Sequence, residues 1–309
     1  MKHIFIINPM AGKTDVSAKL IPEIQKMEGL DYEVVLTEYP CHGKELARKF
    51  AQEYKEKNEN VRIYACGGDG TLNEVMEGAY GYSNVEIGCL PYGTGNDYVK
   101  NFGAASDFQN ISRVVNGTSI DVDILETDEG IAAEICTVGF DANVGYNTRH
   151  YKKLPLCHGK MAYNLSVVEC LLQPIGTHLK LNIDGEVFED DYLMVCLANG
   201  TTYGGGYKSA PEADLCDGLI DIIIVNKVSR PYIAKIISKY ADGSYQENCK
   251  VKPKFQHCIT YLRGKNITIE GPKDFVSNLD GECKVQKKIH VKMVEKAMKF
   301  IVPEGLKYR

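Results

Sequence analysis

Three glycines and an aspartate stand together directly after a short apolar run, in residues 66–74, which read Cys-Gly-Gly-Asp-Gly-Thr-Leu-Asn-Glu. Glycines allow positive φ angles, and successive backbone N–H groups in such a turn bind anions. Thr71 and Glu74 have the spacing of a capping box, which predicts that a helix begins here with its positive end toward the turn. Phosphate is expected at that end, and the Asp69 carboxylate beside it suits Mg²⁺ or proton transfer. A purely structural turn would need the glycines but not Asp69.

A second turn of the same kind follows the apolar run 85–90. Residues 91–97 read Pro-Tyr-Gly-Thr-Gly-Asn-Asp, so a strand, a glycine turn and the carboxylate of Asp97 again precede a predicted helix. Loops at the carboxyl ends of strands in one sheet line a single crevice. The two turns together therefore predict one site that contains Asp69 and Asp97.

Other glycine turns carry less information by themselves. Residues 8–13, Asn-Pro-Met-Ala-Gly-Lys, follow the first apolar run, and Lys13 has the charge to reach phosphate oxygens, but the spacing of a Walker A loop is missing. In the second half, residues 204–218 and 280–282 combine glycines with carboxylates. Composition alone leaves these segments as ordinary turns and hairpins.

The elements that position these turns differ between the two parts of the chain. Up to about residue 124, short apolar runs alternate with helical patterns, which predicts parallel strands covered by helices on both faces. These strands are expected at 3–8, 32–38, 61–66 and 85–90. Beyond residue 125, alternating patterns and the hairpin signal Asp184-Gly185 predict a mainly antiparallel β domain. Its strands are expected at 192–198, 219–226, 266–270 and 287–294, and its helices near 160–173 and 230–241.

The overall composition excludes several classes of protein. The chain has 309 residues, 44% hydrophobic and 25% charged, with a net charge of −5, which argues against disorder and against nucleic acid as a partner. No run approaches the roughly 20 apolar residues of a membrane span. The eleven cysteines form no CxxC pair, so buried thiols in a reducing compartment are favoured over zinc or disulfides.

The last 26 residues, 284–309, are strongly basic, with eight Lys or Arg against two Glu. Such a segment fits either an anionic membrane surface or the solvated face of a strand. Lysines alternate there with Ile289, Val291 and Met293, and the strand interpretation is favoured.

Taken in order along the chain, the motifs resemble the diacylglycerol kinase catalytic-domain family, which includes soluble bacterial lipid kinases and the sphingosine and ceramide kinases. The matching segments are Asn8-Pro9 with Gly12, residues 67–71, 91–97, Val-Gly-Phe-Asp-Ala at 138–142, 204–211 with Asp217-Gly218, and Asp280-Gly281-Glu282. The Gly-Gly-Asp-Gly-Thr motif alone would also fit NAD kinase or a phosphofructokinase.

The resemblance implies a nucleotide-binding α/β domain similar to that of NAD kinase over residues 1–124, to which 297–309 return. A β-sandwich lipid-substrate domain is implied over 125–296. By motif match, ATP would contact Asn8, Pro9, Met10, Ala11, Gly12, Thr37, Gly67, Gly68, Asp69, Gly70, Thr71, Leu72, Asn73 and Thr94. Ala11 stands where the family usually has Ser, which removes one side-chain hydrogen bond but no backbone donor.

The resemblance also implies catalytic and metal roles. Asp69 and Asp97 would belong to a network of Mg²⁺, water and carboxylates, and Glu282 would accept the proton of the lipid hydroxyl. Asp69 stays an alternative for the base. A structural Mg²⁺ would be held by Asp217 and by the carbonyl oxygens of Asp214 and Leu219. Cys216 stands where the family often has an acidic residue or Asn, which weakens that last assignment.

These observations predict a cytoplasmic, ATP- and Mg²⁺-dependent phosphotransferase that acts on a lipid hydroxyl and is peripheral to the inner face of the membrane. Diacylglycerol is the first expectation for the lipid, and phosphatidylglycerol, a sphingoid base or a polyprenol are alternatives. Two other functions stay open: a kinase for a soluble substrate such as NAD, and a non-catalytic sensor of lipid or nucleotide. The three carboxylates argue against the sensor, which needs no base.

Overall fold

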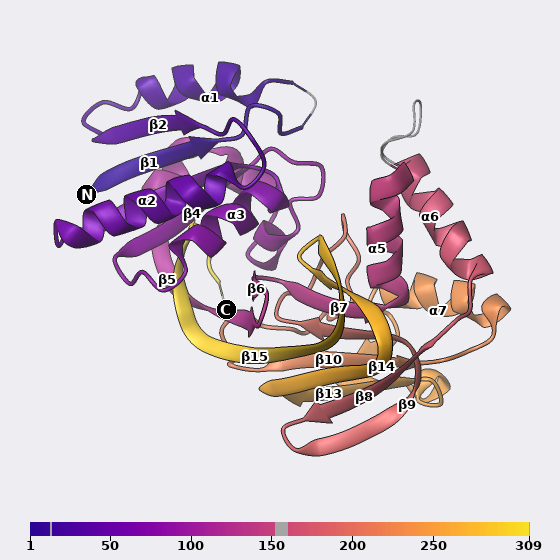
Figure 1. Ribbon diagram of the computed structural model, residues 1–309. Helices are drawn as coiled ribbons and strands as arrows, with labels where there is room; N and C mark the ends of the chain where they lie inside the picture. The colour runs from indigo at the N-terminus through magenta and orange to yellow at the C-terminus, as the bar shows by residue number, and fades with distance from the viewer. Residues whose placement is uncertain (13, 152–159, 309) are drawn as a thin grey trace. The chain divides into compact units, whose positions relative to one another are not determined.

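The computed structural model describes residues 1–12, 14–151 and 160–308, and its backbone divides into two compact units (Figure 1). The first unit consists of Met1–Ile124, Leu215–Asp217 and Val294–Arg309, and the second of Leu125–Asp214 and Gly218–Met293. No pattern in the sequence indicated that residues 215–217 join the first unit. They are held there by backbone and side-chain bonds, including one from Asp123 N to Leu215 O of 2.7 Å.

The sheet of the first unit is parallel, as predicted. Its strands are β1 (Lys2–Ile7), β2 (Tyr32–Leu36), β3 (Val61–Gly67), β4 (Val85–Pro91) and the end of β15 (Glu282–Val302), in the order β2-β1-β3-β4-β15. Strands β1, β3 and β4 are buried almost throughout. Continuous apolar runs of this kind belong to strands that are covered on both faces.

Helices cover both faces of this sheet (Figure 1). Phe5 and Ile7 point to the face where α1 (Val16–Gln25) and α4 (Ile111–Val115) pack. Because side chains alternate along a strand, Ile4 and Ile6 point to the other face, where α2 (His42–Glu56) and α3 (Asp69–Ala79) pack. Two short 3-10 helices follow β4, η1 (Tyr98–Asn101) and η2 (Ala105–Gln109). The predicted helix after Asp97 is therefore only a single short turn.

The predicted capping box at Thr71 and Glu74 is wrong. Helix α3 begins at Asp69, with Gly68 in extended conformation as its N-cap, and Gly68 O already accepts the N–H of Leu72 at 3.1 Å. Thr71 therefore lies inside the first turn. The carboxylate of Glu74 instead accepts the N–H groups of Cys41 (2.9 Å) and Gly43 (3.0 Å), and so caps the neighbouring helix α2.

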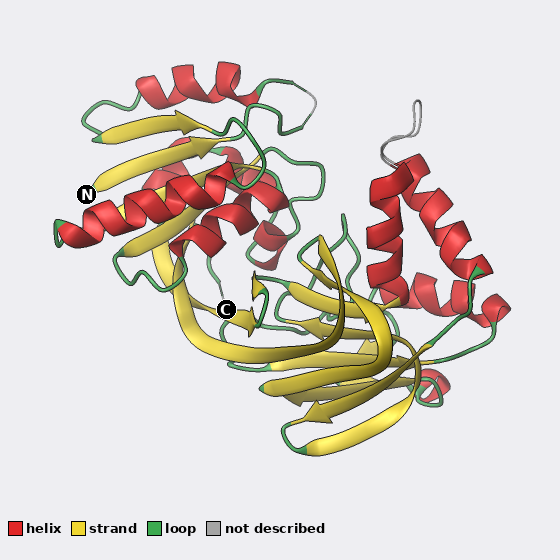
Figure 2. Cartoon of the chain, viewed as in Figure 1, coloured by secondary structure: helices red, strands yellow, loops and turns green. Residues whose placement is uncertain are grey.

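The second unit is built mainly from antiparallel strands, as predicted (Figure 2). Two hydrophobic clusters lie on opposite faces of its central strands. Alternate residues of β9 belong to different clusters: Val195 and Leu197 to the first, Cys196 and Ala198 to the second. The strands are β6 (Gly130–Ala132), β7 (Ile135–Gly139), β8 (Thr177–Ile183), β9 (Glu186–Ala198), β10 (Ile220–Asn226), β11 (Gln246–Glu247), β12 (Lys250–Val251), β13 (Ile259–Gly264), β14 (Asn266–Leu279) and parts of β5 (Thr118–Thr127) and β15.

In the described part of this unit, three helices and a 3-10 turn accompany the strands. Helices α6 (Lys160–Leu172) and α7 (Arg230–Ala241) were expected, whereas α5 (Phe140–Tyr151) and η3 (Pro253–Phe255) were not. Helix α5 escapes sequence reasoning because only Ala142, Val144 and Thr148 are buried, which gives it no clear apolar stripe. Within the described ranges, no helix has both the length and the apolar composition to cross a membrane.

The basic strand and the cysteines fit their simpler interpretations. Ile289 and Val291 are buried, while Lys288 and Lys292 on either side of them pair with Glu270 and Glu126, so the basic segment is a strand with exposed lysines. Seven cysteines are buried as small apolar side chains: Cys66, Cys89, Cys136, Cys170, Cys196, Cys258 and Cys283. Cys157 lies outside the described residues.

One buried histidine predicts a pH dependence of stability. His3 on β1 is 8% exposed, and its Nδ1 lies 2.8 Å from the Tyr64 hydroxyl. Desolvation, and then the charge of Arg62, lower the pKa of His3 to about 4. The unfolded chain binds this proton at higher pH, so the free energy of unfolding should fall as the pH decreases from about 6.5 to about 4.

Urea unfolding at a series of pH values measures this dependence. His3→Gln should flatten the slope over that window, because the substitution removes the titrating ring. The same change at the exposed His150 serves as the matched control. A slope that is identical in wild type and His3→Gln would show that another group causes it.

Candidate active site

Three loops at the carboxyl ends of β1, β3 and β4 are bonded to one another. Asn8 N donates to Cys66 O (2.9 Å), and the Asn8 side chain donates to the Thr71 hydroxyl (3.1 Å). Tyr92 N donates to Gly67 O at 2.7 Å. The prediction that the glycine turns meet at one edge of the sheet is confirmed for the first unit.

The turns approach so closely that side chains are excluded between them. A Cβ atom on Gly93 would lie 2.5 Å from the Cα of Gly68. A Cβ atom on Gly12, whose φ is +76°, would lie 2.6 Å from the carbonyl oxygen of Tyr92. Real Cβ atoms do not approach other heavy atoms to these distances. Glycine is therefore required at these positions by backbone contact.

Asp69 and Asp97 lie side by side. As the first residue of α3, Asp69 accepts the backbone N–H of Asp97 at 2.7 Å. The Asp97 residue is 3% exposed, and one of its carboxylate oxygens lies 2.6 Å from the ammonium group of Lys100. Burial, and then the negative charge of Asp97, raise the pKa of Asp69. A bound cation would offset the unfavourable effect of the Asp97 charge on the Asp69 carboxylate.

Other predicted nucleotide contacts lie in the same sheet or in the segments that follow its strands. Thr37 continues from β2 and donates its N–H to Ile7 O at 2.9 Å. Met10 is exposed and Ala11 is buried. The side-chain oxygen Asn73 Oδ1 is buried, and no donor among the described residues bonds to it. Lys13 lies outside the described residues.

Glu282 belongs to the second unit, as the first residue of β15 after a tight turn. The turn residues Asp280 and Gly281 both have positive φ, +45° and +97°. The Asp280 carboxylate accepts the backbone N–H groups of Ala133 (2.5 Å) and Ile135 (2.8 Å), so Asp280 is structural. Glu282 forms an ion pair with Arg149 at 2.9 Å. That Glu282 meets Asp69 and Asp97 stays a prediction.

The predicted structural Mg²⁺ ligands also stay a prediction. Asp217 is grouped with the first unit, and Asp214 and Leu219 with the second. Between them, Cys216 directs its thiol to the carbonyl oxygen of Asp121 at 3.1 Å. Within residues 1–12, 14–151 and 160–308, no cluster of three or more His, Cys, Asp or Glu residues has the geometry of a metal site.

Two cationic residues beside the predicted carboxylates escaped sequence reasoning. Lys100 stands three residues after Asp97, and that spacing was a usable signal because it places both side chains on one helical turn. Arg149 is 133 positions from Glu282 in the sequence. No spacing rule connects such distant residues.

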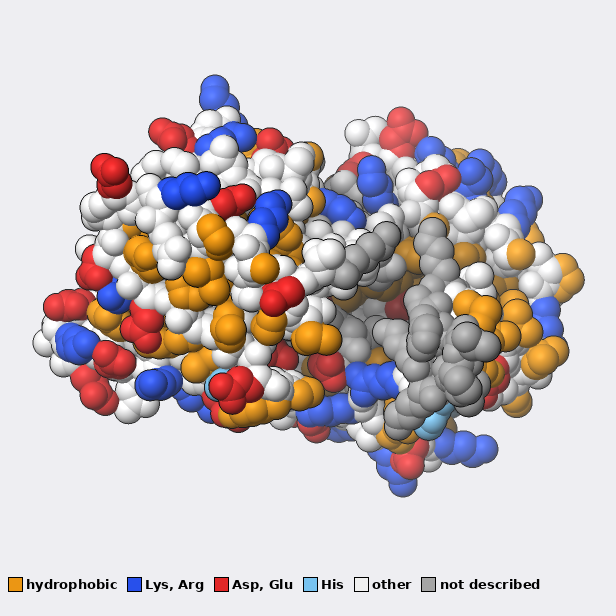
Figure 3. Space-filling model, turned by 90° about the horizontal axis from the view of Figure 1, so that it is seen from above, with side chains coloured by type: hydrophobic (Ala, Val, Ile, Leu, Met, Phe, Trp, Pro, Cys, Tyr) orange, Lys and Arg blue, Asp and Glu red, His pale blue; other side chains and the backbone are white. Residues whose placement is uncertain are grey.

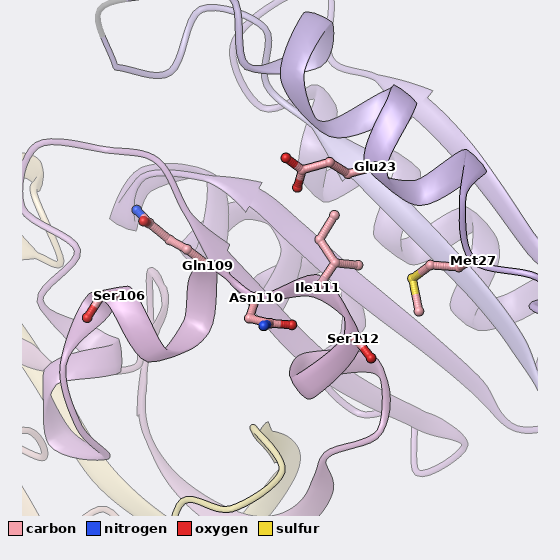
Figure 4. A pocket seen from close by; sticks show the side chains of 7 residues that line it. All are labelled: Glu23, Met27, Ser106, Gln109, Asn110, Ile111 and Ser112. Atoms are coloured by element: carbon pink, nitrogen blue, oxygen red, sulfur yellow. The ribbon is translucent and has the colours of Figure 1, made fainter.

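Lys, Arg, Asp and Glu side chains are intermingled over the first unit on the face shown in Figure 3. Figure 4 shows a surface hollow of the first unit that contains none of the predicted site residues. Its lining residues are Glu23, Met27, Ser106, Gln109, Asn110, Ile111 and Ser112.

Comparison with known proteins agrees with this architecture. Residues 2–127 match the family model of the diacylglycerol kinase catalytic domain, and residues 134–302 match the YegS C-terminal NAD kinase beta sandwich-like domain. A diacylglycerol kinase of Staphylococcus aureus (strain bovine RF122 / ET3-1) is 30% identical over 279 residues, which are 90% of this chain and 84% of that protein. One of Bacillus subtilis (strain 168) is 27% identical over 286 residues, 91% of this chain and 90% of that protein.

The crystal structure of a diacylglycerol kinase from Bacillus anthracis str. Sterne has the same fold, with a TM-score of 0.68 and 20% identity, covering 99% of this chain and 98% of that one. The two units are thus those of a lipid kinase: an α/β catalytic domain followed by a domain rich in β-sheet. The chain belongs to the diacylglycerol kinase family. The predicted family and fold class are confirmed.

The contact between the glycine turns gives a stability prediction. Gly93→Ala should lower the free energy of unfolding by about 2 kcal/mol, because the new methyl group must push the backbone of Gly68 away. Gly70→Ala is the matched control, since a Cβ atom there meets nothing within 4 Å. Urea unfolding curves should show the loss in the first variant only. Equal stability of both variants would contradict the close packing of the turns.

Proposed function

We propose that this protein is an ATP- and Mg²⁺-dependent kinase that transfers the γ-phosphate to the hydroxyl group of a membrane lipid, with diacylglycerol as the preferred acceptor. The observation that carries the proposal is the bond from the Asp97 N–H to the Asp69 carboxylate, beside glycine turns whose backbones touch. The relatives named diacylglycerol kinase supply the lipid class.

The residues present fit a nucleotide. The 11-residue helix α3 begins at the turn and offers its first backbone N–H groups, which together with the helix dipole favour phosphate. Gly12, Gly68 and Gly93 keep side chains out of the space between the loops. The buried Asn73 Oδ1, to which no described residue donates, is an acceptor that a ligand or water can satisfy.

The donor set also fits Mg²⁺, which prefers oxygen ligands and is usually held by one or two carboxylates together with phosphates and water. Asp69 and Asp97 would provide those carboxylates directly or through water. When bound, Mg²⁺ supplies positive charge that stabilises the transferring phosphoryl group. Without the metal, Lys100 offsets part of the charge of the buried Asp97.

Glu282 acts as the general base in this proposal. It accepts the proton of the lipid hydroxyl while that oxygen forms a bond to the γ-phosphorus, and the bond from the γ-phosphorus to the bridging oxygen breaks to release ADP. Asp69 suits this role less well, because a carboxylate beside a cation loses basicity. Glu282 is exposed and can reach a substrate.

A lipid panel tests the substrate. Labelled ATP is supplied with vesicles that contain diacylglycerol, phosphatidylglycerol, a sphingoid base or a polyprenol, and in parallel with soluble NAD. We expect the strongest transfer to diacylglycerol. Labelling of NAD alone would overturn the lipid assignment, and absence of transfer to every acceptor, with ATP bound, would favour a sensor.

Removal of single charges tests the catalytic residues. Asp69→Asn and Glu282→Gln should each lower turnover at least about a hundredfold, because one loses charge stabilisation and the other the proton acceptor. Asp31→Asn and Glu247→Gln, two exposed acids outside the site, are the matched controls. Near-normal turnover in a folded Asp69 or Glu282 variant would remove that residue from the mechanism.

Ligand binding can be measured without turnover. MgATP should raise the melting temperature of the wild-type protein, because a ligand that binds only the folded state stabilises it. ATP with EDTA should raise it less. Asp97→Asn should abolish the difference between these two conditions, since the substitution removes one metal carboxylate. An unchanged difference in this variant would exclude Asp97 from the Mg²⁺ site.

A further inference from the structure

One face of helix α5 runs along the hairpin that carries Glu282. Asp141, Gly145 and Arg149 follow one another at four-residue spacing, which places them in line on the helix. At the middle position a Cβ atom would lie 3.3 Å from the Cys283 sulfur. Glycine there lets α5 lie close against the start of β15. Arg149 is one turn further on and extends over the tip of the hairpin.

The Arg149 guanidinium contacts three successive residues of this tip. It donates to the carbonyl oxygen of Gly281 at 3.1 Å and to that of Cys283 at 3.4 Å. Between these two bonds it donates to Glu282 Oε2 at 2.9 Å. The arginine therefore holds the backbone on both sides of Glu282 as well as the carboxylate itself.

An isolated ion pair at a surface contributes little, because both long side chains must be ordered to form it. The Glu282 side chain is 75% exposed and that of Arg149 43%, so the ion pair is not a stabilising feature in its own right. The two bonds to backbone carbonyl oxygens lower the cost of ordering the arginine side chain, because they fix the guanidinium independently of the carboxylate. The tip is rigid as well, since Asn278 Oδ1 accepts the N–H of Gly281 at 2.8 Å.

We infer that Arg149 is a positioning residue for Glu282, whose carboxylate it orients for proton transfer. The inference rests on the proposed function, in which Glu282 is the base. A carboxylate that is held in one orientation needs less rearrangement before it accepts the proton of a bound hydroxyl. Because the guanidinium occupies Oε2, the other oxygen of Glu282 is directed to the lipid hydroxyl. Helix α5 thereby becomes part of the catalytic framework.

Three variants measure the role of Arg149. Arg149→Met keeps much of the apolar stem and removes the donors, and should lower kcat about tenfold or more while the KM for ATP stays unchanged. Arg149→Lys keeps the charge but not the fork of donors, and should recover part of the loss. Arg230→Met is the matched control, because that guanidinium also bonds to two backbone carbonyls, of Leu171 and Gln173.

A double-mutant cycle then separates orientation of the base from general support of the fold. If Arg149 acts through Glu282, adding Arg149→Met to Glu282→Gln should cost nothing further in kcat. The assay must detect turnover as low as about 10⁻⁴ of the wild-type value, because loss of an acid–base residue lowers turnover by up to about that factor.

The outcomes distinguish the two claims. Normal turnover of Glu282→Gln would overturn the assignment of the base in the proposed function. A hundredfold loss in Glu282→Gln with an unaffected Arg149→Met would overturn the inference alone. The inference would also fail if Arg149→Met lowered kcat equally in both backgrounds, or if Arg230→Met reproduced its effect. Melting temperatures of all variants identify losses that come from unfolding.

Discussion

The first unit depends on a single steric constraint, the backbone contact between the turns that follow β3 and β4. Neighbouring parallel strands bring the two turns together, but only glycine at 68 and 93 lets them touch. The contact places Asp97 where its N–H reaches the carboxylate of Asp69. The same first turn of α3 supplies Thr71, whose hydroxyl accepts from Asn8 and ties in the loop after β1. The loops after three strands thus converge at one edge of the sheet.

That edge was predictable because its determinants are local. Each turn has its glycines and its aspartate within a few residues, and alternating strand and helix patterns imply a parallel sheet whose carboxyl ends share an edge. The exact start of α3 was not predictable in the same way. Thr71 and Glu74 have the spacing of a capping box, but Glu74 is used by α2, whose left-handed N-cap at Cys41 has no side-chain cap of its own. A tertiary partner decided between two locally acceptable arrangements.

The structure of the second unit was harder to predict, because the residues that determine it are distant from one another in the sequence. Helix α5 has no clear apolar stripe, and its packing depends on the absence of a side chain at Gly145 opposite Cys283. Asp280 and Glu282 stand two positions apart in one motif, yet their environments separate their roles. Asp280 is saturated with backbone N–H donors and holds β7, whereas Glu282 projects from the strand that follows. Only tertiary contacts distinguish the structural carboxylate of Asp280 from the exposed carboxylate of Glu282.

A common arrangement recurs in the two units. Asp97 has Lys100 one helical turn away at 2.6 Å, and Glu282 has Arg149 at 2.9 Å. The choice of cation follows the surroundings. Asp97 is buried and its N–H is already used by Asp69, so a single flexible ammonium group suffices to offset its charge. Glu282 is exposed and has no burial to restrict it, so its orientation needs a planar donor that is itself anchored to the backbone. Each carboxylate is therefore ordered by the contacts within its own unit, and a group that is already ordered needs little reorganisation for the reaction that we propose.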